Sequence, residues 1–392
     1  MKKRSTTSNL MCFVSDVIKK LEKRQQVDAI YFDFSKAFDK VPHALAIDKL
    51  RCMGLPEWIM KWLSSYLFDR SAFVKIRGAE SLQFRIPSGV PQGSHLGPLI
   101  FVLFINDVCS LLVSDKLLYA DDLKIFRKIT SPLDCCILQR DIDTLLRWCV
   151  LHGMEMNIKK CSVIIFSRQR APLNYSYRMK SNVVKRVTSI KDLGVNIDDK
   201  ASSSEHIEMV SAKAFAILGF VRRNASDFTD VYALKSLYCS LVRSVLEYAV
   251  QIWAPQIVVQ CNILERVQRF FVKFALRRLQ WRDPTRLLTY EQRCKLIDLD
   301  TLACRRVTLQ RMVPFDLLEG NIDCSQLLSQ IHFHAPQRRL RAPTLLWLLG
   351  HRTNYGRNNP FSVCCRLFNV VSDVYDFRVS KNCFKRTIRF RN

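Results

Sequence analysis

Apolar and polar positions follow two different patterns along this chain. From residue 11 to about residue 197, short apolar runs typical of strands alternate with longer stretches of helical period, such as 43–53 and 134–151. The strand-like runs read "DAIYFDF", "AFVKI", "KLLYA", "LKIF" and "CSVIIF". Gly54 and Pro56 predict the end of the first helix. The pattern predicts an α/β or α+β domain.

Beyond about residue 200 the pattern becomes helical. Ser202 and Glu205 have the spacing of a capping box and predict a helix of roughly four turns after them. Segment 230–253 predicts a further helix that ends before Pro255, because apolar residues recur in it at steps of three and four. These residues are Leu234, Leu237, Leu241, Val245, Tyr248 and Ile252. The change of pattern places a domain limit near residue 200.

The helix predicted over 262–279 carries two stripes. Ile263, Val267, Phe270 and Phe274 predict the face that packs. Arg266, Arg269, Lys273 and Arg277 form a second face about a quarter turn away, which can contact phosphates or be an ordinary solvated rim.

Composition and charge narrow the class of protein. The 392 residues are 48% hydrophobic and 24% charged, a globular balance with enough apolar side chains for a core. The net charge of +26 is distributed over the whole chain, with +12 in residues 1–200 and +14 in residues 201–392. Such an excess favours a polyanionic partner, and nucleic acid above an anionic membrane surface.

Neither a membrane anchor nor a secreted location is expected. The longest uncharged apolar run, 97–106, is about half of the ~20 residues that a membrane span needs. The N-terminus lacks the apolar stretch of a signal peptide, so we expect an intracellular protein of the cytoplasm and nucleus. In that reducing environment its 15 cysteines are expected to be mostly free thiols, and their spacing does not favour a zinc site.

Three carboxylates follow strand-like runs. In "KLLYADDLKIF" a turn at Ala120, Asp121 and Asp122 predicts a hairpin with both acids at its tip, and Asp33 ends the run Ala29 to Phe32. Taken singly, such aspartates are ordinary turn or cap residues. If the strands are neighbours, however, their mutual repulsion requires cations, and oxygen ligands select Mg²⁺. Two such ions support in-line phosphoryl transfer.

The loop "PSGVPQGSHLGPLIF", residues 87–101, lies between these sites, and its glycines and prolines allow close approach to a ligand. Together these segments resemble the reverse transcriptases of non-LTR retrotransposons, most closely the jockey-like lineage. "FDFSKAFD" resembles motif A of that family, "SGVPQGSHLGPLIF" motif B, "YADD" motif C and "GMEMNIKKC" motif D, while "KDLGVNID" is similar to the primer-grip segment.

The resemblance implies a role for individual residues. Asp33 and Asp121, assisted by Asp122, would hold two Mg²⁺ ions, with Mn²⁺ as an alternative. Phe38 would exclude a 2′-hydroxyl, although it can also be a core aromatic, and Gln92 and Gly93 would lie near the incoming nucleotide. Lys160 would neutralise or protonate the pyrophosphate, or be a solvated surface lysine.

The implied fold is α+β: a right-hand polymerase with an antiparallel palm sheet, partial fingers, a helical thumb and a helical C-terminal region. We expect a reverse transcriptase domain over 1–197, a thumb over 198–280 and a basic C-terminal region over 281–392. The expected partners are an RNA template, a DNA primer and deoxynucleoside triphosphates. Because earlier fingers strands of the family are not seen before "KKRSTTSNL", an N-terminally truncated relic that binds nucleic acid without catalysis is the alternative.

Overall fold

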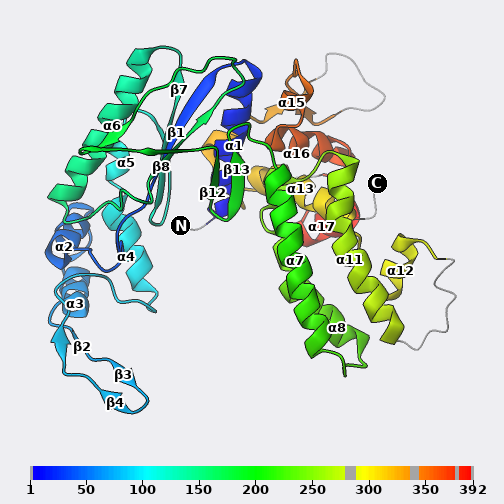
Figure 1. The fold of residues 1–392 in the computed structure, drawn as a ribbon, viewed down its shortest axis with the longest axis horizontal. Helices are drawn as coiled ribbons and strands as arrows, with labels where there is room; N and C mark the ends of the chain where they lie inside the picture. Colours follow the sequence, from blue (N-terminus) through cyan, green and yellow to red (C-terminus); the bar gives the residue numbers. More distant parts are fainter. Residues whose placement is uncertain (1–2, 279–287, 336–343, 376–378, 390–392) are drawn as a thin grey trace. The chain divides into compact units, whose positions relative to one another are not determined.

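The computed structural model describes residues 3–278, 288–335, 344–375 and 379–389 (Figure 1). The chain forms two compact units. We call Arg24–Thr188 the sheet unit, and Met1–Lys23 with Ser189–Asn392 the helical unit. The predicted limits at residues 197 and 280 concern functional domains and stay a prediction.

A five-stranded sheet, in the order β11-β8-β1-β7-β6, organises the sheet unit. Its central strand is antiparallel to both neighbours, β6 is antiparallel to β7, and only β11 runs parallel to the strand beside it. The five strands are β1 (Gln26–Phe32), β6 (Asp115–Tyr119), β7 (Asp122–Ile129), β8 (Ser162–Phe166) and β11 (Lys185–Val187). This sheet confirms the α+β class and the antiparallel palm that the sequence predicts.

The apolar run of β1 reflects its central place. Six of its seven residues are buried, because neighbouring elements cover both faces of the strand. One of the six is Asp28, whose carboxylate accepts hydrogen bonds from Gln26 Nε2 and Tyr177 Oη, both at 2.8 Å. Burial raises the pKa of Asp28. These bonds satisfy a polar group that would otherwise destabilise the core.

Helices complete the core of the sheet unit. The predicted helices 43–53 and 134–151 are confirmed as α2 and α6, and the apolar run 97–106 forms α4. The helices are α2 (His43–Cys52), α3 (Glu57–Leu67), α4 (Leu96–Ile105), α5 (Val108–Leu111) and α6 (Pro132–Leu151). Short strands form two-stranded antiparallel sheets: β2 (Ser71–Ala72) with β5 (Phe84–Arg85), β3 (Lys75–Ile76) with β4 (Ala79–Glu80), and β9 (Arg178–Met179) with β10 (Asn182–Val183).

The helical unit begins with α1 and resumes after the sheet unit with a hairpin and long helices. Its first elements are α1 (Thr6–Glu22), β12 (Ser189–Asp192), β13 (Val195–Asp198), α7 (Ser204–Asn224), α8 (Val231–Leu237), a π-helix (Tyr238–Arg243), α9 (Ser244–Glu247), α10 (Val250–Trp253) and α11 (Val258–Arg278). Its later elements are α12 (Tyr290–Leu296), α13 (Leu302–Leu318), α14 (Ser325–Leu328), β14 (His332–Phe333), β15 (Leu346–Trp347), α15 (Asn354–Arg357), α16 (Pro360–Asn369), a 3-10 turn (Ser372–Val374) and α17 (Lys381–Arg389). Among the described residues, no helix has both the length and the apolar character to cross a membrane.

The predicted capping box at Ser202 and Glu205 is wrong. Helix α7 begins at Ser204, its N-cap is Ser203 without a side-chain cap, and it runs for 21 residues rather than about four turns. The carboxylate of Asp198 accepts the N–H groups of Lys200 and Ser202, which holds Ser202 in the turn before the helix. A local side-chain bond therefore competes with the cap.

The single helix predicted over 230–253 is also wrong. A π-helical turn over Tyr238–Arg243 and a left-handed residue, Ala249 with φ 49°, interrupt it. Each wider π turn shifts the buried face, so the residues that pack after Leu234 are Tyr238, Val242 and Leu246. The predicted Leu241 and Tyr248 are 42% and 43% exposed.

Candidate active site and nucleic-acid interface

The three predicted carboxylates lie at one end of the two central strands of the sheet. The ladder between β1 and β7 ends at the pair Phe32 and Leu123. Asp33 is the next residue after β1, and Asp122 is the residue before Leu123 on the neighbouring strand. Asp121 lies in the turn between β6 and β7, so the predicted hairpin with both acids at its tip is confirmed.

The hairpin tip has an unusual backbone conformation. Ala120, the first residue of the two-residue turn, has φ 54°, in the left-handed region. For a residue with a Cβ this conformation costs about 1–2 kcal/mol. Strain of this kind persists where the surrounding structure fixes the backbone, and here the ladder on both sides of the turn does so. The turn holds Asp121 half-buried and Asp122 exposed.

The motif D-like segment is attached directly to Asp33. The carbonyl oxygen of Asp33 accepts the N–H of Asn157 at 2.8 Å, and Ser35 N–H donates to the carbonyl oxygen of Glu155 at 2.8 Å. Lys160 Nζ lies 3.7 Å from Asp33 Oδ2, with 69% of the lysine side chain exposed. The structure thus brings Lys160 to the acidic site, with most of its side chain in contact with solvent.

A buried thiol lies beside the same carboxylate. Cys161 is 1% exposed, and burial raises the pKa of its thiol to about 11, with the negative charge of Asp33 acting in the same direction and a hydrogen bond with the Asp33 backbone opposing it. The thiol is therefore protonated at neutral pH, and Cys161 adds no charge to the site.

The motif B-like loop is fixed to the segment that follows Asp33. Val90 N–H donates to the carbonyl oxygen of Phe38, and Gly89 N–H donates to that of Val41, both at 2.8 Å. Gln92 Nε2 donates to Asp39 Oδ1 at 2.8 Å. Two of the predicted nucleotide-binding residues are therefore connected to the same turn through backbone or side-chain bonds.

Phe38 and Gly93 occupy different environments in this arrangement. The ring of Phe38 packs on that of Phe101, with centroids 4.4 Å apart, and is partly buried. Gly93 has φ 81°, and a Cβ there would meet nothing within 4 Å, so its side is open. Phe38 can thus be positioned by the core, and the backbone at Gly93 is accessible to a ligand.

Two further residues hold the motif B-like loop and were not predicted from the sequence. Asp39 orients Gln92, and the buried His43 donates from Nε2 to the carbonyl oxygen of Gly89 at 2.7 Å. The signal for Asp39 was its place in "FDFSKAFD", directly after Phe38. Nothing in the local pattern singled out His43, because it reads as the first residue of a helix.

The oxygen donors at the end of β1 and β7 bear on the expected divalent ion. Within the described ranges, no group of three or more His, Cys, Asp or Glu side chains is arranged to hold a metal ion. Mg²⁺ does not require such a cage, because it is usually bound by one or two carboxylates together with waters and substrate phosphates. Asp33, Asp121 and Asp122 supply only oxygen donors and lie at one end of neighbouring strands, which is compatible with that coordination.

The predicted basic face of α11 is exposed, whereas its predicted apolar face is partly wrong. Arg266, Arg269, Lys273 and Arg277 are all exposed. Phe270 is 47% exposed and shares their face, while the buried face contains Leu264, Val267, Gln268 and Phe271. The prediction failed because two polar residues, Glu265 and Gln268, are buried on the side that packs.

Further arginines from α7 extend the basic face. Arg222, Arg223, Arg277 and Arg278 line a hollow of about 560 Å³ together with Gly219 and Phe274. The guanidinium of Arg222 lies over the rings of Phe270 and Phe274, at 4.9 and 5.5 Å from their centroids. Such stacking holds a cation in place and is favourable by about 0.5–1 kcal/mol at exposed sites. The sequence pattern did not predict that α7 contributes to this face.

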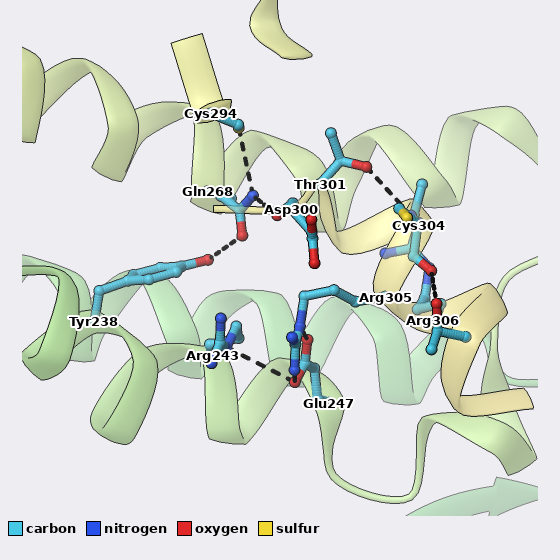
Figure 2. A network of polar contacts seen from close by, with 12 residues as sticks. Tyr238, Arg243, Glu247, Gln268, Cys294, Asp300, Thr301, Cys304, Arg305 and Arg306 are labelled. Carbon is cyan, nitrogen blue, oxygen red and sulfur yellow. Dashed lines mark hydrogen bonds and ion pairs between the residues drawn. The ribbon is translucent and has the colours of Figure 1, made fainter. Parts of the chain in front are cut away.

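A buried polar network fixes the opposite side of α11 (Figure 2). Gln268 accepts from the hydroxyl of Tyr238 at 2.9 Å and donates to the carbonyl oxygen of Asp300 at 2.8 Å. On α11 itself the buried Glu265 pairs with Arg306 at 3.5 Å, and nearby Glu247 of α9 pairs with Arg305 of α13. These bonds orient α11 so that its basic face points to solvent.

Comparisons with known proteins identify the family of the chain. The profile of the family described as "Reverse transcriptase (RNA-dependent DNA polymerase)" matches residues 1–214. The chain is 24% identical over 269 residues to the "Probable RNA-directed DNA polymerase from transposon BS" of Drosophila melanogaster, covering 64% of this chain and 29% of that protein. It is 26% identical over 211 residues to the "RNA-directed DNA polymerase from mobile element jockey" of the same species, covering 52% and 23%.

Solved telomerase structures overlap with the chain more weakly. Apo telomerase from Candida tropicalis gives a TM-score of 0.42 at 11% identity, over 71% of this chain and 47% of that one. This overlap is too small to support an argument. The family profile covers more than half of the chain, and the predicted resemblance is confirmed: the chain belongs to the reverse transcriptase family, among relatives from non-LTR retrotransposons.

Proposed function

We propose that this chain catalyses RNA-templated DNA synthesis as the polymerase of a non-LTR retrotransposon. The observation that carries the proposal is the position of Asp33, Asp121 and Asp122 at the same end of adjacent antiparallel strands, in a chain of the reverse transcriptase family. The chain matches 29% and 23% of the length of the two relatives described above, so this activity is inferred from the matched region. The substrates would be an RNA template, a DNA primer and deoxynucleoside triphosphates.

Each site residue has a proposed part in nucleotide addition. Asp33 and Asp121, with Asp122 beside them, would hold two Mg²⁺ ions, or Mn²⁺ in their place. When bound, these ions would lower the pKa of the primer hydroxyl and neutralise charge on the phosphates. Members of the family generally use divalent metal ions.

The neighbouring residues would position the substrate. Lys160, 3.7 Å from Asp33, would neutralise or protonate the departing pyrophosphate. Phe38, held against Phe101, would meet the sugar of the incoming nucleotide and exclude a 2′-hydroxyl. Gln92, oriented by Asp39, would contact the nucleotide, and the open backbone at Gly93 would permit its close approach.

The exposed face of α11 would bind the RNA–DNA hybrid. Arg266, Arg269, Lys273 and Arg277 can pair with phosphates, and the exposed ring of Phe270 lies among them. Because RNA templates and target DNA are found inside cells, we propose that the protein acts in the cytoplasm and nucleus.

A primer-extension assay tests the catalytic proposal. The purified chain is given an RNA template with an annealed DNA primer, deoxynucleotides and Mg²⁺, with a chelator control. We expect Asp121→Ala to abolish incorporation, since the ions would then have ligands from one side only. Asp48→Ala is the matched control, because Asp48 is an exposed aspartate on α2 whose contact with Arg51 is a surface ion pair of small energy.

Binding of the same hybrid, followed by fluorescence anisotropy across a salt series, separates binding from chemistry. The logarithm of affinity should fall with the logarithm of salt concentration, with a slope of roughly one per phosphate contacted. The double variant Arg269→Ala with Lys273→Ala should reduce that slope by about two. Salt-dependent binding without any incorporation by the wild-type chain would instead support the alternative, a nucleic-acid-binding protein without polymerase activity.

A further inference from the structure

Two cysteines that are far apart in the sequence meet within the helical unit. Cys12 lies on α1 and Cys324 directly precedes α14, and their sulfur atoms are 3.1 Å apart. All 15 cysteines lie in the described part of the chain, and none of them is in a disulfide there. A disulfide has a sulfur–sulfur bond of about 2.05 Å, so these two sulfurs would need to approach by only about 1 Å.

The backbone around this pair is held in place. The carbonyl oxygen of Lys3 accepts the N–H of Asp323 at 2.9 Å, and Arg4 Nε lies 3.4 Å from Asp323 Oδ2. On the other side, the carbonyl oxygen of Cys324 accepts the N–H groups of Leu327 and Leu328. The first contacts join the residues before α1 to the neighbour of Cys324, and the second hold Cys324 at the start of α14, which limits the movement needed to form a covalent bond.

The two thiols differ in environment in the way that a reactive cysteine and its resolving partner differ. Cys12 is 3% exposed, on the buried face of α1, whereas Cys324 is partly exposed and can be reached from solvent. The hydrogen bond from the Cys12 thiol lowers the pKa of Cys324 to about 6; burial opposes this shift, while the N–H groups of Leu327 and Gln326 and the charge of Arg4 favour it. A thiolate of this kind is the nucleophilic form of cysteine.

We propose that Cys324 and Cys12 form a peroxide-sensitive thiol pair that closes into a disulfide between α1 and the segment following α13. The Cys324 thiolate attacks one oxygen of hydrogen peroxide and breaks the O–O bond, giving a sulfenic acid and, after protonation of the leaving hydroxide, water. The Cys12 sulfur then attacks the sulfenic sulfur, losing its proton and expelling a second water. Both thiols are oxidised by two electrons in total, and one peroxide is reduced to two waters.

Closure would join α1 covalently to a position 312 residues further along the chain. Because the loop is long, a disulfide here would restrict the unfolded state strongly, and a glutathione- or thioredoxin-type reductant would reverse it. The proposal is independent of polymerase activity, since neither cysteine belongs to the proposed catalytic site.

Mass spectrometry of the full chain tests the pair. The protein is treated with equimolar hydrogen peroxide, trapped with N-ethylmaleimide and digested with trypsin, which should release residues 5–19 and 312–338, each with one cysteine. We expect a linked 5–19/312–338 peptide that forms at least tenfold faster than oxidation of Cys52, an exposed thiol on α2. The linked peptide should disappear on reduction and in Cys12→Ser, while Cys52→Ser should leave it unchanged.

The same treatment in urea shows whether the fold directs the reaction. In the unfolded chain Cys12 and Cys324 should pair no more often than other cysteines, so the selectivity should be lost. Two results would overturn the proposal. One is a Cys12–Cys324 disulfide that forms in the folded chain no faster than Cys52 is oxidised. The other is oxidation of Cys324 to a sulfinic acid while Cys12 stays unmodified.

Discussion

Gly89 and Gly93 form a matched pair for testing how tightly the motif B-like loop is held. Both residues have positive φ, 93° and 81°, so an alanine at either position is strained by about 1–2 kcal/mol. A Cβ at Gly93 would meet nothing within 4 Å. A Cβ at Gly89 would lie 2.8 Å from the carbonyl oxygen and 2.9 Å from the Cα of Asp39, which are backbone atoms that cannot rotate away.

The expected energies differ for this reason. Gly93→Ala should lower the free energy of unfolding of the sheet unit by about 1 kcal/mol or less, because alanine also reduces the entropy of the unfolded chain by about 0.4–1 kcal/mol. Gly89→Ala must in addition displace Gly89, whose N–H donates to Val41 and whose carbonyl accepts from His43. Weakening these two hydrogen bonds adds about 2 kcal/mol to the strain of about 1 kcal/mol, so we expect Gly89→Ala to lower the free energy of unfolding by about 3 kcal/mol.

Hydrogen exchange provides the measurement. The urea dependence of exchange in peptides from β1 and β7 gives the stability of the sheet unit without interference from the helical unit. Primer extension on the same samples should show a higher KM for the incoming nucleotide in Gly89→Ala, since Gln92 moves with the loop. Stabilities of the two variants within about 0.5 kcal/mol of each other would refute the close packing of Gly89 on Asp39.

Three further predictions concern sugar selectivity and pH dependence. Phe38→Ala should raise ribonucleotide use relative to deoxynucleotide use in primer extension, and an unchanged ratio would identify Phe38 as a core aromatic that packs on Phe101. Burial lowers the pKa of His206 to about 4, so the fold favours its neutral form. The free energy of unfolding should be highest above about pH 6.5 and fall by up to about 3 kcal/mol toward pH 4. In urea unfolding measured across this pH range, His206→Gln should show a smaller decrease. Hydrogen bonds, first that from the Thr130 hydroxyl, lower the pKa of Asp134 to about 2. The ionised carboxylate should therefore add up to about 2 kcal/mol to the free energy of unfolding above pH 4, and this stability should be lost as the pH falls to 2. Asp134→Asn should remove this pH dependence.

The parts of the fold that could be predicted from sequence are those set by local pattern. The run SVIIF of β8 is apolar after its first residue and wholly buried because the strand is covered on both faces, and the turn residues between Tyr119 and Asp122 predicted the hairpin. The spatial order of the strands depends on pairings between residues over a hundred positions apart, such as Val27 with Phe166. The resemblance to a known family implied an antiparallel palm sheet, but the order β11-β8-β1-β7-β6 comes from the structure.

The helical unit was harder to predict because its packing departs from a regular period. Because of one π-helical turn, Val242 rather than Leu241 lies on the buried face. The pattern of apolar residues does not predict such a turn. In α11 the buried Gln268 satisfies its amide through Tyr238 and Asp300, which come from other elements. A polar residue whose hydrogen-bond partners come from other elements of the fold is predicted to be exposed when only the sequence is considered.

The segment from Asp33 to His43 connects the separate parts of the candidate active site. Its first residue receives the motif D-like segment through the backbone bond from Asn157, and Asp39 and His43 hold the motif B-like loop. Asp33 itself lies next to the strand that carries Asp122. Eleven consecutive residues thus fix the relative positions of the acids, Lys160 and Gln92. Since phosphoryl transfer loses rate steeply when reacting groups are misplaced by about 1 Å, the proposed reaction would depend on this shared support of residues that are far apart in sequence.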